Sequence, residues 1–134
     1  MYYFINMTPH EVTLVGEDDT IQAIPPSGIV LRRTSTVEHV STVDGVRLYR
    51  ERLTDVSRED VQNALLDAPA DADAIVLIVS RVCADAPGLV ETAEEFTRRH
   101  GTIVLVTVPA TGQAIRDSEG RIVGVPGLVV VHQT

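Results

Sequence analysis

The sequence contains no lysine, and its eleven basic residues are all arginine. This absence excludes Schiff-base chemistry, a lysine general base and the lysine of the Walker phosphate loop. A single cysteine, Cys83, excludes an intrachain disulfide, so nothing indicates an oxidising compartment. No apolar run approaches the about twenty residues that span a bilayer, and the start of the chain lacks the charged leader of a signal peptide. We therefore expect a cytoplasmic protein that does not enter the membrane.

Aromatic residues are scarce at 4% of the chain, and tryptophan is absent, which weakens base stacking as a mode of recognition. Clustered metal ligands are also missing, because no His-x-x-x-His motif occurs and the four histidines are scattered at His10, His39, His100 and His132. The segment Gly124–Gly127 has a proline where a glycine-rich dinucleotide loop would open a helix. We expect neither a metal nor a cofactor.

The chain contains 44% hydrophobic and 22% charged residues, a composition typical of globular proteins. Its length predicts a single domain covering residues 1–134. The net charge is −8. Ten acidic residues lie between Asp55 and Glu95, where only Arg58 and Arg81 oppose them. A general nucleic-acid binder needs a basic face, so this class of protein is not expected.

Two kinds of pattern divide the chain near residue 53. The first part has short β signals, a break at Pro25-Pro-Ser-Gly28 and a hairpin signal at Asp44-Gly45, which together predict an antiparallel meander. Its expected extended segments are residues 2–5, 11–15, 20–24, 28–40 and 46–53.

The second part alternates strand and helix signals. Ser57 with Asp60 is typical of a helix start, and a helix over 91–99 should end at Gly101. The almost purely apolar runs 74–79 and 102–108 predict strands buried on both faces. A small hairpin around 118–120 and a last strand over 128–131 follow. The expected fold is mixed α/β: an antiparallel N-terminal meander joined to a sheet with buried strands and two or three helices.

Polar residues follow both buried strands at the point where each strand ends. Ser80 and Arg81 follow the first, and the loop after the second carries Thr111, Gly112, Arg116 and Asp117. Ligands in open α/β sheets sit at the carboxyl ends of strands, so these residues predict a pocket. Arginine side chains there would suit phosphate or carboxylate groups, which a guanidinium binds through two parallel hydrogen bonds. The structural alternatives are a helix N-cap at Ser80 and a hairpin ion pair between Arg116 and Asp117.

Two further polar clusters lie in the first part of the chain. Asn6, Thr8 and His10 surround a proline-fixed backbone, and an Asx or Ser/Thr turn is the structural alternative. Ser27 and Gly28 would expose backbone N–H groups near Arg32, a combination that suits an anion. The alternative there is a plain turn followed by a surface arginine.

These motifs together carry a resemblance. Four features follow one another along the chain: Asn6-x-Thr-Pro-His10, Pro25-Pro-Ser-Gly28 followed by Val30-x-Arg32, the strand ending at Ser80, and Arg116-Asp117-x-x-Gly120-Arg-Ile-Val-Gly124. In this order they resemble a small protein family of tailed phages and prophages, notably of actinobacteria. The resemblance implies a phage context and no settled enzymatic activity. The chain departs from the family where Ser80 is followed by Arg81-Val-Cys83 and where residues 85–100 are richer in helix signals.

The leading functional hypothesis is a binding protein that sequesters a small anionic, nucleotide-like ligand such as an immune signalling molecule. Arg32 and Arg116 would supply charge, and the side chains that orient the ligand would be Thr8, His10, Ser27, Ser80 and Thr111. One alternative is an acidic inhibitor that covers a host factor or imitates nucleic acid. Another is a hydrolase or transferase acting on a nucleotide or ADP-ribosyl compound, with Asp117 or His10 as acid or base. Homo-oligomerisation would suit a small sequestering protein, because pockets shared between subunits bury more of the ligand.

Overall fold

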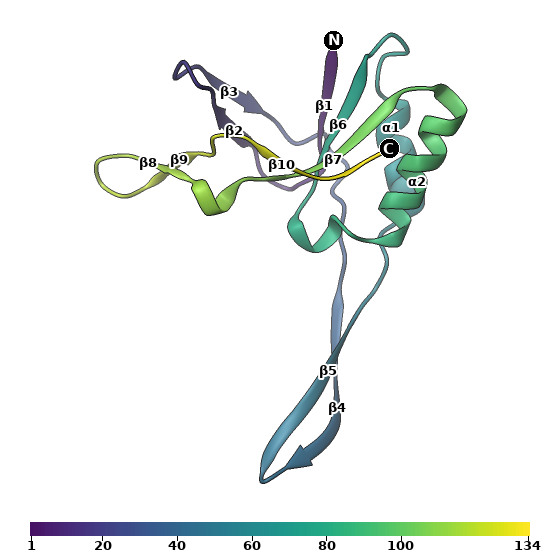
Figure 1. The fold of residues 1–134 in the computed structure, drawn as a ribbon, viewed down its shortest axis with the longest axis vertical. Coiled ribbons are helices and arrows are strands. Elements are labelled where there is room, and N and C mark those ends of the chain that lie inside the picture. Colours follow the sequence, from purple (N-terminus) through teal and green to yellow (C-terminus); the bar gives the residue numbers. More distant parts are fainter.

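A four-stranded sheet forms the centre of the computed structural model, which describes residues 1–134 (Figure 1). The strand order is β1 (Tyr2–Asn6), β6 (Ala74–Ile78), β7 (Ile103–Pro109) and β10 (Leu128–Gln133). The first three strands are parallel, and β10 pairs antiparallel with β7 at one edge.

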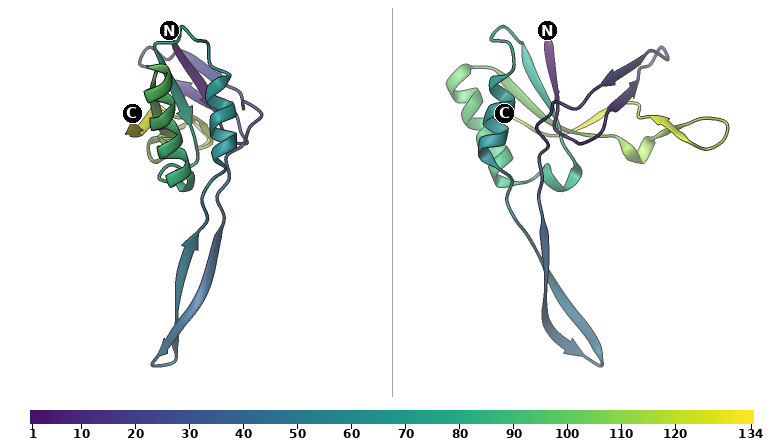
Figure 2. Two further views of the ribbon diagram at one scale, coloured as in Figure 1. Left: turned by 90° about the vertical axis from the view of Figure 1, so that its right-hand side faces the viewer. Right: turned by 180° about the vertical axis from the view of Figure 1, so that it is seen from behind.

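The predicted buried strands are β6 and β7. Every residue of β6 is buried, and side chains of alternate residues serve the two faces of the sheet. On one face, Leu77 and Val106 belong to the main core together with residues of α1 (Arg58–Leu66) and α2 (Pro87–His100). Both helices therefore cover the same face, as Figure 2 shows.

The helix ends follow from local chemistry. The Ser57 hydroxyl accepts a hydrogen bond from the backbone N–H of Asp60, at 3.2 Å, and caps α1 as predicted. Helix α2 begins at Pro87, four residues before the predicted start, because proline suits the first helical turn. Ala86 offers no capping side chain, and the Asp55 carboxylate instead accepts the Gly88 N–H at 2.8 Å.

The opposite face of the sheet carries a smaller cluster. The hairpin of β2 (Val12–Val15) and β3 (Ile21–Ile24) brings Val12 and Ile24 against Ile78. The short hairpin of β8 (Ile115–Arg116) and β9 (Ile122–Gly124) joins β2 through backbone hydrogen bonds between Val125 and residues 13 and 15. Gly124 permits this approach, because a Cβ there would lie 2.9 Å from the Thr13 carbonyl oxygen.

A long hairpin of β4 (Ser35–Val43) and β5 (Val46–Leu53) projects from the body as an arm (Figures 1 and 2). Asp44 and Gly45 at its tip have positive φ angles of 49° and 78°, as a type I′ turn requires. Every residue of both strands is exposed. We call residues 35–53 the arm.

The mixed α/β fold, with antiparallel N-terminal strands joined to a sheet of buried strands, is confirmed. The N-terminal strands differ from one continuous meander in their pairing: β1 pairs with β6, and β2–β3 and β4–β5 are separate hairpins. Pairing with β6 buries Ile5 and Met7 in the main core, which a local pairing would leave outside it. The segment predicted as extended over 28–40 becomes a strand only at Ser35. No helix combines the length and the apolar character needed to cross a membrane.

Candidate functional site

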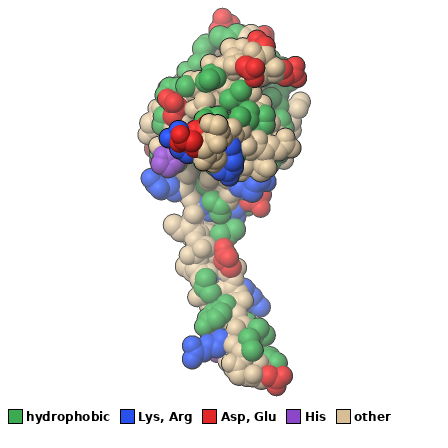
Figure 3. Space-filling view, turned by 90° about the vertical axis from the view of Figure 1, so that its left-hand side faces the viewer, with side chains coloured by type: hydrophobic (Ala, Val, Ile, Leu, Met, Phe, Trp, Pro, Cys, Tyr) green, Lys and Arg blue, Asp and Glu red, His purple; other side chains and the backbone are tan.

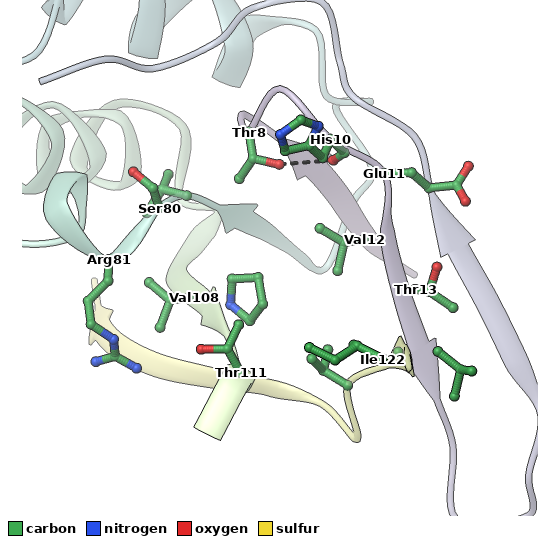
Figure 4. Close-up of a pocket in the computed structure, with 15 residues that line it drawn as sticks. Thr8, His10, Glu11, Val12, Thr13, Ser80, Arg81, Val108, Thr111 and Ile122 are labelled. Atoms are coloured by element: carbon green, nitrogen blue, oxygen red, sulfur yellow. Dashed lines mark hydrogen bonds between the residues drawn. The ribbon is translucent and has the colours of Figure 1, made fainter. Parts of the chain in front are cut away.

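An open hollow of about 460 Å³ lies where β6 and β7 end (Figure 4). We call it the edge pocket. Two buried valines reach it, Val79 directly after β6 and Val108 near the end of β7. The 3₁₀ turns η1 (Arg81–Cys83) and η2 (Thr111–Gln113) follow the two strands. The full lining is Thr8, His10, Glu11, Val12, Thr13, Val79, Ser80, Arg81, Val108, Pro109, Thr111, Ile122, Val123, Gly124 and Val125.

The parallel pairing of β6 with β7 explains why distant polar residues meet here. Ile78 lies opposite Thr107, and the backbone N–H of Val79 donates to the Thr107 carbonyl at 2.9 Å. The segments that follow β6 and β7 therefore leave the sheet at the same edge, as the sequence predicted. Ser80 and Thr111 consequently line one pocket although they are far apart in the sequence.

The loop after β1 forms another wall, and a buried amide holds its shape. The side-chain N–H₂ of Asn6 donates to the carbonyls of His10 at 2.8 Å and Ile24 at 3.0 Å. Its Oδ1 accepts from the backbone N–H and the hydroxyl of Thr8, at 3.0 and 2.6 Å. Asn6 is 1% exposed and lies outside the lining, so it shapes the loop from which Thr8 and His10 reach the pocket.

Arg81 is the one arginine of the lining. Its exposed side chain makes no ion pair and no hydrogen bond within the protein. Figure 4 shows Arg81 and Thr111 on the side of the pocket away from Thr8 and His10. The sequence pattern placed Arg81 beside Ser80 at this edge, but Arg81 was not among the expected binding residues because the chain departs there from the family that it resembles. Ser80 itself begins η1 without a capping hydrogen bond from its side chain.

Arg32 lies in a neighbouring hollow of about 270 Å³. This hollow also includes Thr8 and Ser80, which it shares with the edge pocket. Ser27 and Gly28 line neither cavity. The Ser27 backbone N–H donates to the Asn6 carbonyl at 2.8 Å, so this turn packs behind the loop that carries Thr8.

The remaining predicted residues lie outside the lining of the edge pocket. Arg116 donates to the Gly120 carbonyl at 2.8 Å, and Asp117 pairs with Arg121 at 2.9 Å. Hydrogen bonding lowers the pKa of Asp117, with the backbone N–H of Arg121 as the largest cause. Within the β8–β9 hairpin, Arg121 pairs with Asp117 and Glu119, while Arg116 is held by a backbone carbonyl and makes no ion pair. Gly112 lies in η2 beside Thr111 but does not line the cavity.

No protein-family model, curated protein or solved structure matches this chain. No three side chains of His, Cys, Asp or Glu come together as a group that could hold a metal ion. The function is therefore argued from the edge pocket, and the resemblance to phage proteins stays a prediction.

Proposed function

We propose that the protein binds a small anionic ligand in the edge pocket, with the anionic group at Arg81. The observation that carries this proposal is an exposed guanidinium without a protein partner beside a hollow with apolar and hydroxyl-bearing walls. A guanidinium binds phosphate or carboxylate through two parallel hydrogen bonds, so an unpaired one is suited to a ligand of this charge.

The size and lining of the edge pocket support this assignment. Small-molecule sites occupy about 300–1,000 Å³ and combine apolar walls with a few polar groups. Here valines and Ile122 supply the apolar surface, and the hydroxyls of Ser80 and Thr111 supply donors and acceptors. The Thr8 hydroxyl donates to Asn6 Oδ1 and offers a ligand an acceptor. A larger ligand with a second anionic group could also contact Arg32. This arginine lies in the neighbouring hollow, which Thr8 and Ser80 line as well.

A nucleotide-like ligand is the class we favour, recognised through phosphate and sugar. The lining contains no phenylalanine, tyrosine or tryptophan, so base stacking contributes little to its recognition. In the phage context that the sequence resembles, such a protein would hold a nucleotide-derived immune signal away from its receptor. This role requires tight binding without turnover.

Calorimetry with cyclic dinucleotides, ADP-ribose derivatives and NAD-related compounds tests the proposal. We expect binding by at least one of these classes, and a loss of about tenfold or more in affinity for Arg81→Ala, as for a charged hydrogen-bonding partner. Arg98→Ala is the matched control, because Arg98 is also exposed and unpaired but lies on α2, outside the pocket. Absence of binding across the panel, or equal affinities of the two variants, would overturn the proposal.

A second measurement separates sequestration from catalysis. Ligand recovered unchanged after the complex is denatured supports sequestration, and a modified product supports the hydrolase or transferase hypothesis. Asp117, one of the two acid–base candidates of that hypothesis, is engaged by Arg121 and lies outside the pocket. The acidic-inhibitor hypothesis gains less support, because Arg58 and Arg99 pair with Glu91 and Glu95 on the helical face.

A further inference from the structure

The arm has no partner within the molecule. Both of its strands are exposed along their whole length, and no third strand pairs with either. Figure 3 shows apolar and charged side chains distributed along it below the body. A two-stranded hairpin alone is marginally stable in water, whereas three or more strands are stable when they share an apolar surface. Seven large apolar side chains of the arm are 42–64% exposed: Val37, Val40, Val43, Val46, Leu48, Tyr49 and Leu53.

The base of the arm is fixed to the body. The side chain of Arg33, 10% exposed, donates to the carbonyls of Thr54 at 2.7 Å and Val82 at 3.0 Å and pairs with Asp85 at 2.7 Å. Thr34 and Thr54 add hydrogen bonds between the two segments of the chain that lead into and out of the arm. The arm therefore leaves the body in a defined direction, which lowers the entropy lost when a partner binds.

The charge distribution favours a second copy of this chain as that partner. The arm contains three arginines and three acidic residues, so the rest of the chain carries the whole net charge of −8. Two bodies repel each other, whereas two arms meet without net repulsion. Antiparallel arms also place the bodies at opposite ends of a ribbon of about 26 Å, for eight residues at about 3.3 Å each, which exceeds the Debye length of about 8–10 Å.

The outer edge of β5 is the one suited to pairing. Strand β4 contains a bulge at Val40, a feature that protects sheet edges, whereas β5 has no bulge, proline or glycine. Val43 and Val46 flank the two-residue turn and form the hydrogen-bonded pair that closes it. Since backbone groups alternate in direction along a strand, those of Arg47, Tyr49 and Glu51 point to the outer edge.

The sequence of β5 is complementary to itself in one antiparallel register. When Tyr49 lies opposite Tyr49 of the second copy, Arg47 lies opposite Glu51 of the second copy, and the same pair repeats across the two-fold axis. Neither Arg47 nor Glu51 has an ion partner within its own chain, whereas Arg52 pairs with Glu38 at 3.2 Å. Opposite charges directly across two strands stabilise a sheet, and like charges destabilise it.

We propose that two copies of this protein associate through their arms, with β5 pairing antiparallel to β5 about Tyr49 to form a four-stranded sheet. Such an interface is isologous, because the same surface serves both subunits. This inference does not depend on the ligand proposed for the edge pocket.

Charge reversal tests the proposed register. Sedimentation equilibrium is expected to show a dimer of the unaltered chain. For Arg47→Glu and for Glu51→Arg the dissociation constant of the dimer should be about tenfold or more higher, since each change places like charges opposite each other twice. Mixing the two variants restores both opposite-charge pairs and is expected to restore the dimer. Arg98→Glu on α2 is the control for Arg47→Glu, because it carries the same charge change away from the arm.

A cross-link tests the position of the two-fold axis. Residues in a hydrogen-bonded antiparallel pair have Cα atoms about 5.5 Å apart, within the about 4.4–6.8 Å that a disulfide spans. Tyr49→Cys is therefore expected to form a disulfide-linked dimer on mild oxidation, while Val46→Cys is not, because it faces residue 52 of the second copy. Cys83 is buried and does not compete. A monomeric unaltered chain, failure of the mixture to restore the dimer, or equal cross-linking of both cysteine variants would overturn the proposal.

Discussion

Replacing Asn6 by alanine is expected to destabilise the protein more than its small volume suggests. The Asn6 side chain is buried and makes four hydrogen bonds, which connect β1 to the loop of Thr8 and His10 and to the end of β3. Alanine removes all of these contacts and leaves their partners in place. The change therefore probes the element that shapes one wall of the edge pocket.

The magnitude depends on which partners water can reach. His10 is exposed, so solvent replaces the lost donor at its carbonyl, and the Thr8 hydroxyl keeps the His10 carbonyl as a partner at 3.0 Å. The carbonyl of Ile24, a residue only 6% exposed, and the backbone N–H of Thr8 lose partners that water does not easily replace. Two unsatisfied groups at about 1–3 kcal/mol each would cost about 2–6 kcal/mol. Because the contact of the Thr8 N–H is only part-buried, we expect the lower part of this range, a loss of about 2–4 kcal/mol in the free energy of unfolding.

Urea unfolding followed by far-ultraviolet circular dichroism measures this loss, and the melting temperature should fall by about 10 °C. Asn63→Ala is the matched control: Asn63 is exposed on α1, where alanine favours the helix, so this change should leave stability equal or slightly higher. A loss below about 1 kcal/mol for Asn6→Ala, equal to that of the control, would refute the role assigned to the buried amide.

Two further predictions concern close approaches within the fold. Gly124→Ala places a Cβ 2.9 Å from the Thr13 carbonyl and should cost about 1–3 kcal/mol in urea unfolding, whereas Gly112→Ala, where a Cβ meets nothing within 4 Å, should be nearly neutral; equal effects would refute the tight contact of β9 with β2. Asp55 has a pKa lowered chiefly by the backbone hydrogen bond from Gly88, so its stabilising contribution is present above the unfolded pKa of about 3.9 and is lost as the pH falls through the lower folded value. The difference in unfolding free energy between the unaltered chain and Asp55→Asn should therefore shrink on acidification, and a difference that is constant with pH would contradict this assignment.

Local patterns in the sequence predicted several elements directly. The apolar runs that became β6 and β7 indicated burial on both faces, Asp44-Gly45 indicated the turn of the arm, and Ser57 indicated the start of α1. Each of these signals depends on neighbouring residues alone. Strand pairing does not, and β1 was therefore assigned to the N-terminal strands although it lies beside β6.

The candidate site was likewise predicted from the sequence only in part. The rule that ligands bind at the carboxyl ends of parallel strands led to Ser80 and Thr111, which line the edge pocket. It did not separate Arg81 from Arg116, because both follow a buried strand. Arg116 lies on the β8–β9 hairpin and donates to the Gly120 carbonyl, while Arg81 stays unpaired in the pocket lining.

The sequence by itself determined the mixed α/β class, the two buried strands and the edge of the sheet where polar residues gather, since hydrophobic periodicity and turn chemistry are local properties. Only the tertiary structure decided that β1 joins the sheet in parallel, that Asn6 holds the loop of Thr8 and that the arm extends without a partner. These features depend on which distant segments bury apolar surface together and satisfy each other's backbone groups. The free energy that favours one pairing over another is therefore a sum over contacts of the whole folded chain, and no local segment determines it.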